Sequence, residues 1–368
     1  MSFSSQYRGK RVLVTGCTGF KGAWLSLWLD ALGARVSGLA LGLPTEPAMF
    51  GELGMESFVD FHPGDVRDRA FVDKVVAEVK PEVVFHLAAQ AIVRTSYEDP
   101  VGTFATNVMG TAHVLDALRR CDHPVAAVMI TSDKCYENVE WVYGYRETDA
   151  LGGKDPYSAS KAAAEMAIRS WTHSFFPPGR SPVRVVAVRA GNVIGGGDWA
   201  EARIVPDAMR AWSEARPVVI RSPNATRPWQ HVLEPLSGYL LAGARLIEGA
   251  CPSGEAFNFG PPAEQSLSVR NLLRALAPHW GFVEEGEYLH IEPAQFHEAG
   301  LLKLNCDKAL AILGWRPVLD AAETARLTAS WYAHFYRDRE LSMLDYTRAQ
   351  LAEYEGLAQA RGLAWTSA

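Results

Sequence analysis

A tyrosine and a lysine stand four positions apart, as Tyr157 and Lys161, at the start of a helical pattern. Asp155 suits the cap of such a helix, and Pro156 suits its first turn. This spacing places both side chains on one face, where the lysine ammonium favours the phenolate and lowers the pKa of the tyrosine. The pair can then take a proton from a hydroxyl group while a hydride leaves the same carbon.

A second reactive group, Ser132-Asp133-Lys134, follows an apolar run at 125–131. Asp133 can protonate a leaving hydroxyl group if its pKa is raised enough to hold a proton. Lys134 can remove a carbon-bound proton if burial or nearby cations lower its pKa, and otherwise it stabilises an enolate. Glu137 is an alternative base, and an ion pair in a loop is the non-catalytic interpretation. An enzyme that only moves a hydride has no need of this second acid and base.

Hydride chemistry needs a cofactor, and the turn Gly16–Gly22 lies between a β-rich run and a helical segment. Glycines in such a turn let backbone N–H groups approach a pyrophosphate, and the helix N-terminus adds partial positive charge. A tight turn without a ligand is the alternative. Two later segments, 64–67 after the third expected strand and 86–90 at the end of the fourth, are expected to extend the same site. The predicted cofactor-binding residues are Gly16, Thr18, Gly19, Phe20, Lys21, Gly22, Asp65, Val66, Leu87, Ala88, Ala89, Asn107, Tyr157 and Lys161.

The choice between the two nicotinamide dinucleotides depends on the end of the second strand. An NAD site commonly has Asp or Glu about 20 residues after the glycines, and an NADP site has Arg. The segment Leu41–Pro44 holds neither. Arg35 precedes the strand and is expected at its wrong end. We therefore predict NAD, with NADP left open.

Short apolar runs alternate with helical patterns over the first half of the chain. This alternation predicts an α/β fold with a doubly wound parallel Rossmann sheet. The expected strands are 11–15, 35–41, 58–61, 83–87, 125–131 and 183–188, and the expected helices are 23–32, 68–80, 101–120 and 157–175.

After Gly191, glycine and proline become frequent and the strand signals shorten. We predict a smaller C-terminal substrate-binding lobe, interleaved with the Rossmann domain, with strands at 218–221 and 289–291. The predicted divisions are a dinucleotide-binding domain over 1–190 with returning segments near 232–262, a substrate lobe mainly over 191–340, and a helical tail over 341–368. The tail can be a final packed helix or an oligomer contact.

Composition limits the partners and the compartment. Hydrophobic residues form 48% of the 368 residues, and the formal net charge of -6 disfavours bulk attraction to nucleic acid or anionic membranes. Five scattered cysteines without a C-x-x-C pair argue against a disulfide framework or a zinc site, so no metal is expected. With neither a signal-peptide core nor an apolar run of about 18 residues, we expect a cytoplasmic protein.

Together the motifs resemble the extended short-chain dehydrogenase/reductase superfamily and, within it, the CDP-glucose 4,6-dehydratases, from about residue 9 to about residue 317. The string Thr131–Asn138 is the most discriminating, because related dTDP-glucose dehydratases carry Thr-Asp-Glu in place of Ser132-Asp133-Lys134. The other supporting strings are 18–22, 86–90, 155–161, 189–199 and 227–232.

The resemblance implies an NAD-dependent enzyme that turns CDP-glucose into CDP-4-keto-6-deoxyglucose and water. In the implied cycle Tyr157 takes the C4 hydroxyl proton, Ser132 hydrogen-bonds the C4 oxygen, and the C4 hydride goes to the nicotinamide. Lys134 removes the C5 proton, Asp133 protonates the departing C6 hydroxyl, and the hydride returns to C6. The alternatives are a 4-epimerase or a dehydratase for another nucleotide on the same scaffold, and a non-catalytic dinucleotide-binding regulator.

A sugar nucleotide carries a diphosphate, which needs arginine or backbone donors. Arg227 is similar to the family's diphosphate clamp, and His297-Glu298 resembles a family motif near the nucleoside. A surface position is the alternative for each arginine. The predicted substrate-binding residues are Gln90, Asn192, Arg203, Arg221, Arg227, His297 and Glu298. The resemblance also implies a homodimer through a four-helix interface, formed by the helices at 101–120 and 157–175 of each chain.

Overall fold

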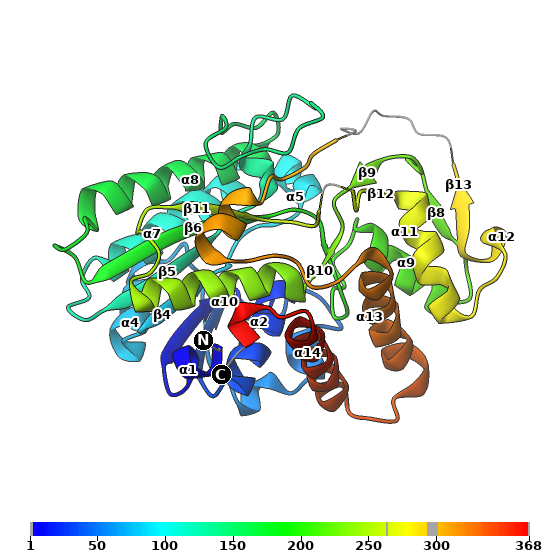
Figure 1. Ribbon diagram of the computed structural model, residues 1–368, viewed down its shortest axis with the longest axis horizontal. Helices are drawn as coiled ribbons and strands as arrows, with labels where there is room; N and C mark the ends of the chain where they lie inside the picture. The colour runs from blue at the N-terminus through cyan, green and yellow to red at the C-terminus, as the bar shows by residue number, and fades with distance from the viewer. Residues whose placement is uncertain (1–2, 263, 293–300, 367–368) are drawn as a thin grey trace.

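The computed structural model describes residues 3–262, 264–292 and 301–366. Within them, a seven-stranded sheet has the order β11-β6-β5-β4-β1-β2-β3, and all neighbouring strands are parallel (Figure 1). Runs of valine, isoleucine and alanine suit strands that are covered on both faces. The predicted doubly wound parallel sheet is confirmed. Its strands are β1 (Arg11–Thr15), β2 (Arg35–Ala40), β3 (Asp60–Pro63), β4 (Val83–His86), β5 (Val125–Ile130), β6 (Val183–Ala190) and β11 (Ala256–Phe259).

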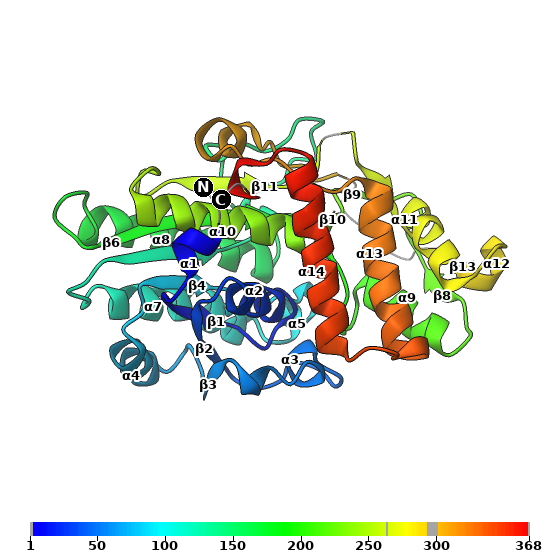
Figure 2. The same ribbon diagram turned by 60° about the horizontal axis from the view of Figure 1, so that its bottom comes forward.

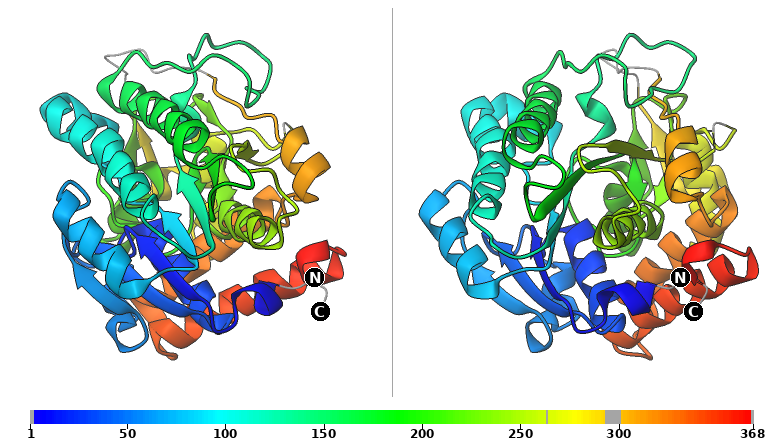
Figure 3. Two further views of the ribbon diagram at one scale, coloured as in Figure 1. Left: turned by 90° about the vertical axis from the view of Figure 1, so that its left-hand side faces the viewer. Right: turned by 60° about the vertical axis from the view of Figure 1, so that its left-hand side comes forward.

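Helices cover both faces of the sheet, and α7 and α8 lie side by side on one of them (Figure 3). The layer with α8 holds α4 (Arg69–Val79), α5 (Val93–Glu98), α6 (Pro100–Phe104), the π-helical turn η2 (Ala105–Met109), α7 (Gly110–Leu118) and α8 (Pro156–Phe175). The opposite layer holds α1 (Phe3–Tyr7), α2 (Phe20–Ala31) and α10 (Leu233–Glu248), which packs on β5 and β6. This cover leaves the carboxyl ends of the strands at one edge, where ligands bind in such sheets.

A smaller lobe lies beside that edge, on the right of Figure 1. It contains α9 (Ile204–Ser213), α11 (Val269–Leu276), α12 (Glu285–Tyr288), the parallel pair β8 (Val218–Ile220) and β13 (Leu289–Ile291), and the antiparallel pair β9 (Thr226–Arg227) and β12 (Leu267–Ser268). A short parallel pair, β7 (Val193–Ile194) and β10 (Gln230–His231), joins this lobe to the sheet domain.

The C-terminal segment packs against the smaller lobe through its first helix and against the sheet domain through its second. Helices α13 (Ala321–Ala333) and α14 (Met343–Ala360) lie side by side (Figure 2). Trp28 Nε1 donates to Glu355 Oε1 at 2.8 Å, and Trp331 Nε1 donates to Thr347 Oγ1 at 2.9 Å. The tail is therefore a packed helix, which is one of its two predicted roles. The remaining short elements are α3 (Met49–Glu52), η1 (Met55–Ser57), η3 (Asp133–Cys135), η4 (Ala277–Trp280), η5 (Ala309–Leu313), η6 (His334–Asp338) and η7 (Ala364–Thr366).

Several predicted bounds differ from the structure by one to three residues, and two predicted elements differ in place or in kind. The third strand was predicted at 58–61 but runs over Asp60–Pro63, because Phe58 still closes the turn η1 through its N–H to Met55 O at 3.1 Å. The helix predicted at 101–120 is divided by η2. In this π-helical turn the side chain of Asn107 is buried and bonds to neighbouring segments, which hydrophobic periodicity does not reveal.

Candidate active site

The glycine turn connects β1 to α2 and passes very close to other backbone segments. Gly16 has a φ of +74°, and a Cβ there would lie 2.8 Å from Ala88 N. A Cβ at Gly22 would lie 2.0 Å from Gly16 O. Only glycine fits at both positions, because the turn closes on itself and lies directly against the loop after β4. This cradle suits the pyrophosphate of a dinucleotide, and the first turn of α2 supplies partial positive charge.

One cavity of about 820 Å³ runs along the carboxyl ends of the strands. The sheet domain supplies one wall, and the segment 191–206, which leads into the smaller lobe, supplies another. Its volume suits a ligand site of the usual size. Most predicted site residues line it, namely Gly16, Thr18, Gly19, Phe20, Lys21, Gly22, Asp65, Val66, Leu87, Ala88, Ala89, Ser132, Asp133, Lys134, Tyr157, Lys161, Asn192, Arg203 and Arg227.

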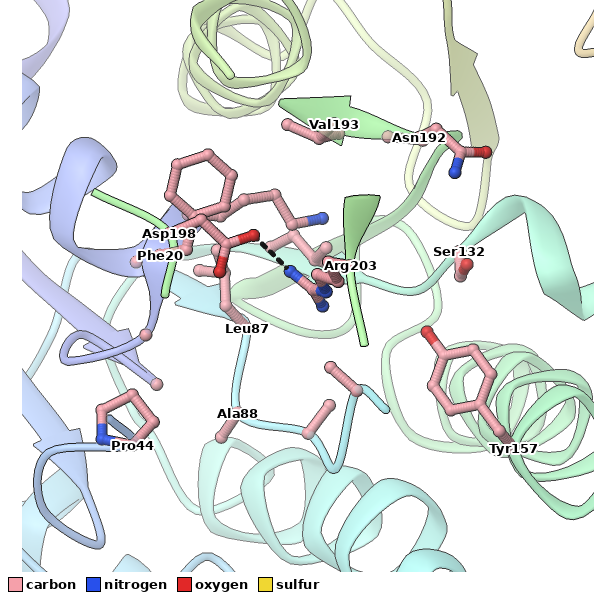
Figure 4. Close-up of a pocket in the computed structure, with 18 of the residues that line it drawn as sticks. Phe20, Pro44, Leu87, Ala88, Ser132, Tyr157, Asn192, Val193, Asp198 and Arg203 are labelled. Carbon is pink, nitrogen blue, oxygen red and sulfur yellow. Dashed lines mark hydrogen bonds and ion pairs between the residues drawn. The ribbon is translucent and has the colours of Figure 1, made fainter. Parts of the chain in front are cut away.

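Local sequence places the reactive tyrosine. Asp155 caps α8, because its Oδ1 accepts from Ser158 N at 2.9 Å, and Pro156 occupies the first turn. The cap starts α8 beside the end of β5, where Ser132 begins the turn η3. As a result, the hydroxyl groups of Ser132 and Tyr157 face one another in the cavity (Figure 4).

Ser132 also contacts Asp133 and Lys134. Ser132 Oγ donates to Asp133 Oδ1 at 3.0 Å and accepts from Lys134 N at 3.2 Å. Asp133 Oδ2 is buried and has no hydrogen-bond partner among the described residues. Lys134 is half-buried in the cavity wall, whereas Glu137, the alternative base, is exposed and outside the lining. Hydroxyl, carboxyl and phenol groups therefore meet at one point.

The pKa values at this point depart from their usual ranges. Burial raises the pKa of Tyr157 to about 12, and the charge of Asp133 acts in the same direction, whereas a hydrogen bond with Ser132 lowers it. The lowering expected from the sequence is therefore outweighed by burial. Burial lowers the pKa of Lys161 to about 8, against the effect of Cys135 and Glu165. Lys161 can therefore change its protonation state near neutral pH, whereas burial keeps Tyr157 a neutral phenol in that range.

Asp133 and Lys21 form a second perturbed pair. Burial raises the pKa of Asp133, although Lys134, Ser132 and Lys21 act against it, and a raised pKa is what an acid in this position needs. Burial also lowers the pKa of Lys21 to about 7, and the charges of Lys161 and Arg203 add to that effect. Lys21 belongs to the glycine turn, yet its Nζ lies 3.5 Å from Tyr239 Oη and its charge acts on Asp133.

The smaller lobe contributes an arginine that is already paired. Arg203 precedes α9 and its Nη1 contacts Asp198 Oδ2 at 2.9 Å, as the dashed line in Figure 4 marks. Burial acts to lower the pKa of Arg203, but the Asp198 carboxylate raises it. Asp198 is not among the site residues predicted from the sequence. Asp198 could have been found from its position in the string 189–199, which supports the family resemblance.

A buried ion pair lies beneath the segment that carries Thr131 and Ser132. Arg189 Nε and Nη2 contact Glu165 Oε1 and Oε2 at 2.8 and 2.9 Å, and both residues are less than 5% exposed. Thr131 Oγ1 also donates to Glu165, and Arg189 Nη1 donates to Tyr136 Oη at 2.6 Å. These bonds fix the end of β5 against α8. Glu165, one helical turn after Lys161, is likewise absent from the site residues predicted from the sequence.

Several predicted site residues lie elsewhere. Asn107 is buried behind the cavity, where its amide bonds to Gln90 O at 3.0 Å and Ser160 Oγ at 2.8 Å. Gln90 Nε2 donates to Thr103 Oγ1, so Gln90 and Asn107 hold the loop after β4 and are absent from the cavity lining. Arg221 is exposed and also lies outside the lining, because it follows β8 on the smaller lobe. The predicted residues His297 and Glu298 lie outside the described residues.

The residues at the rim of the cavity near the glycine turn indicate which dinucleotide the site fits. Leu41, Gly42, Leu43 and Pro44 line the cavity after β2, and Thr18 Oγ1 donates to Gly42 O at 2.6 Å. Arg35 is exposed at the opposite end of β2, as expected. The site therefore fits a dinucleotide whose ribose lies against an uncharged rim.

Two further features of the described residues concern metals and membranes. They contain no cluster of three or more histidine, cysteine, aspartate or glutamate residues placed to hold a metal ion. In the same part of the chain, no helix combines the length and apolar character of a bilayer-crossing segment.

Comparison with known proteins finds relatives in sequence and in fold that cover most of the chain. The chain is 45% identical over 351 residues to a CDP-glucose 4,6-dehydratase from Salmonella typhimurium, with 95% of this chain and 97% of the relative covered. Among solved structures, a Thermus thermophilus UDP-glucose 4-epimerase in complex with NAD superposes with a TM-score of 0.73 at 28% identity, covering 87% of this chain and 98% of that chain.

A Bacillus anthracis dTDP-glucose 4,6-dehydratase in complex with NAD has the same fold, with a TM-score of 0.72 at 20% identity over 87% of this chain and 96% of that chain. The sequence model of the GDP-mannose 4,6 dehydratase family matches residues 13–328. The chain therefore belongs to the GDP-mannose 4,6-dehydratase family of the extended short-chain dehydrogenase/reductases.

Proposed function

We propose that this chain is a CDP-glucose 4,6-dehydratase, which converts CDP-glucose to CDP-4-keto-6-deoxyglucose and water. The observation that carries the proposal is the meeting of Ser132, Asp133 and Tyr157 at one point of the cavity beside the glycine turn. Tyr157 with Lys161 suffices for oxidation at C4. A buried carboxyl group with a raised pKa adds the acid that elimination at C6 requires.

The bound nicotinamide dinucleotide would take the C4 hydride and later return it to C6. Tyr157 removes the C4 hydroxyl proton, and Ser132 hydrogen-bonds the C4 oxygen. Asp133 protonates the departing C6 hydroxyl, while Lys134 removes the C5 proton and later returns it. Lys161 holds positive charge near Tyr157, which favours the phenolate during the oxidation.

On the substrate side, Arg227, Arg203 and Asn192 are proposed to bind the sugar and its diphosphate, since all three line the cavity. His297 and Glu298 are proposed near the nucleoside. Gln90 is proposed to act by holding the loop after β4 in place. Arg221, which lies outside the cavity lining, stays a prediction from the sequence.

NAD is the proposed cofactor. The uncharged rim Leu41–Pro44 offers no cation for the 2′-phosphate of NADP. Two similar solved structures contain NAD. Thr18, Asp65 and the loop Leu87–Ala89 are the proposed contacts besides the glycine turn, because they line the same part of the cavity.

A homodimer is the proposed assembly. The outward faces of α6, η2 and α8 expose Val101, Phe104, Met109 and Met166. Apolar side chains gathered on a helix pair suit a partner surface, and two such pairs form a four-helix interface. Sedimentation of the purified protein tests this, since a monomer at micromolar concentration contradicts it.

The activity is tested with a panel of CDP-, dTDP-, UDP- and GDP-hexoses. We expect product only, or fastest, with CDP-glucose, and base-treated product should absorb near-ultraviolet light as a 4-keto sugar does. An epimerised sugar without this absorbance would indicate a 4-epimerase. No turnover of any sugar nucleotide by the cofactor-loaded protein would indicate a binding protein.

A further inference from the structure

We propose that Arg203, which Asp198 holds in place, supplies the fixed positive charge that stabilises the Tyr157 phenolate while C4 of the sugar is oxidised. This inference rests on the proposed dehydration. It makes the smaller lobe part of the proton step, because Arg203 precedes α9 of that lobe whereas Tyr157 lies in α8 of the sheet domain. Arg203 acts through Tyr157, and Asp198 acts through Arg203, so both are positioning residues.

The oxidation step creates the need for a nearby cation. The C4 hydride leaves for the nicotinamide and the hydroxyl proton goes to Tyr157, which can accept it only as a phenolate. Burial holds the pKa of this phenol at about 12, so the anion is costly unless an opposite charge lies nearby. Lys161 is one such charge, but its pKa of about 8 means that the charge is lost as the pH rises. A guanidinium stays charged throughout this range.

Arg203 and Tyr157 extend into the same cavity from different elements (Figure 4). The positive charge of Arg203 acts to lower the pKa of Tyr157, and Tyr157 acts to raise the pKa of Arg203. The same charge also acts to lower the pKa of Lys21, which belongs to the glycine turn. The guanidinium therefore lies within electrostatic reach of both the phenol and the glycine turn, at the catalytic end of the cavity.

Asp198 fixes the direction of the guanidinium. Arg203 Nη1 donates to Asp198 Oδ2 at 2.9 Å, and Asp198 Oδ1 accepts from Ala200 N at 3.0 Å, so both carboxylate oxygens are bound. The backbone of Asp198 is anchored by Tyr332 of α13, whose hydroxyl donates to Asp198 O and accepts from Asp198 N at 3.1 Å. A guanidinium has five N–H donors, so the bond with Asp198 leaves others for the cavity.

The backbone immediately before Arg203 has an unusual conformation. Ala202, which also lines the cavity, has a φ of +58°, in the left-handed region that residues with a side chain rarely adopt. Such a conformation persists only where the surrounding structure determines it. The strained turn and the bond to Asp198 together show that the direction of Arg203 is built into the fold.

Arg203 offsets negative charge around the phenol. Both aspartates near Tyr157 act to raise its pKa, and Arg203 acts against them. Loss of the guanidinium would leave these carboxylates less compensated, which makes the phenolate harder to form. The titratable and charged groups that face Tyr157 are Asp133 of η3, Asp155 and Lys161 of α8, Tyr239 of α10 and Arg203.

The test compares Arg203→Met with Arg203→Lys in cofactor-loaded protein mixed rapidly with saturating CDP-glucose. Near-ultraviolet absorbance of the reduced nicotinamide gives the rate of C4 oxidation. In Arg203→Met this rate should fall about 10-fold or more, and its rise with pH should move to higher pH, because the phenolate has lost an opposite charge. Arg203→Lys keeps a positive charge and should recover most of the rate. Arg216→Met is the matched control, since Arg216 pairs with Glu214 outside the cavity lining.

Two results would overturn the inference. If Arg203 only binds the diphosphate, Arg203→Met should bind CDP-glucose more weakly while its oxidation rate at saturation stays unchanged. If the Met and Lys variants oxidise equally slowly, the positive charge is not the cause of the loss.

A measurement without substrate separates this inference from the proposed function. NMR of the lysine side chains follows Lys21, identified by the signal that is missing in Lys21→Met. Its pKa of about 7 should rise in Arg203→Met, because a nearby positive charge is lost. An unchanged titration would place the Arg203 charge away from the catalytic end and reject the inference even if CDP-glucose is not the substrate. No turnover by the native protein, with the titration shifted, would reject the proposed function alone.

Discussion

Two buried polar clusters lie one helical turn apart on α8 and differ in how completely they are paired. Glu165 binds both arms of Arg189 and also accepts from Thr131. Tyr157 and Lys161 instead face the cavity, and burial displaces the pKa of each. The Glu165–Arg189 ion pair, with its hydrogen bonds made, holds the neighbouring elements rigidly. Buried groups whose pKa values are displaced, such as Tyr157 and Lys161, are instead suited to exchange protons. The same helix thus carries both stability and reactivity.

Removal of the phenol should have the largest effect. We expect Tyr157→Phe to lower turnover by about 10³–10⁴-fold, because no group remains to take the C4 hydroxyl proton. Product formation from CDP-glucose measures the loss. Tyr7→Phe is the matched control, since the Tyr7 hydroxyl donates to Leu240 O far from the cavity and activity should persist. Normal turnover in Tyr157→Phe would defeat the oxidation assignment.

Breaking the Glu165–Arg189 ion pair should instead lower the stability of the protein. Glu165→Gln leaves the Arg189 charge buried without its carboxylate, which should reduce the free energy of unfolding by about 3–5 kcal/mol. Thermal or denaturant unfolding measures it. Glu98→Gln removes the exposed 3.2 Å pair with Arg94 and should change stability little. Equal effects of the two substitutions would contradict the comparison.

The acid should affect one step selectively. Asp133→Asn cannot protonate the C6 hydroxyl, so elimination should slow by about 10²–10³-fold while C4 oxidation slows less. Near-ultraviolet absorbance of the reduced nicotinamide reports oxidation, and product analysis reports elimination. If both steps slow equally, Asp133 is not the acid.

Burial of Lys161 should lower the free energy of unfolding at neutral pH. Its pKa of about 8 lies below the usual 10.5, so the folded protein resists protonation of Lys161 that the unfolded chain accepts. Lys161→Met should therefore raise the free energy of unfolding at pH 7 by up to roughly 3 kcal/mol. The gain should shrink as pH rises from about 8 to about 10.5, where both states lose the charge. Lys154→Met, at an exposed position, should give no such pH-dependent gain.

The smallest expected effect concerns the proposed C5 base. Lys134→Ala should reduce deuterium exchange at C5 by about 10-fold or more, since the proton then has no positioned acceptor. Lys308→Ala is a control remote from the cavity, where Lys308 pairs with Glu255. Unchanged exchange in Lys134→Ala would exclude it as the base and leave it as a charge that stabilises the enolate.

Features that are local in the chain could be predicted. The glycine turn, the cap Asp155 and the Tyr157–Lys161 spacing each lie within a few residues, and the structure places them as expected. Contacts between distant segments could not be predicted. The pairs Glu165–Arg189 and Asn107–Gln90 join different elements, and Arg221 lies outside the cavity because the smaller lobe sets its direction.

By itself, the sequence determined the order of strands and helices and the types of reactive side chain at the strand ends, since hydrophobic periodicity and turn residues act over short distances. Only the tertiary structure decided which of those side chains share a cavity and how burial changes their pKa values. Desolvation depends on every neighbour in space, which is why the pKa of Tyr157 rises although its lysine is four residues away.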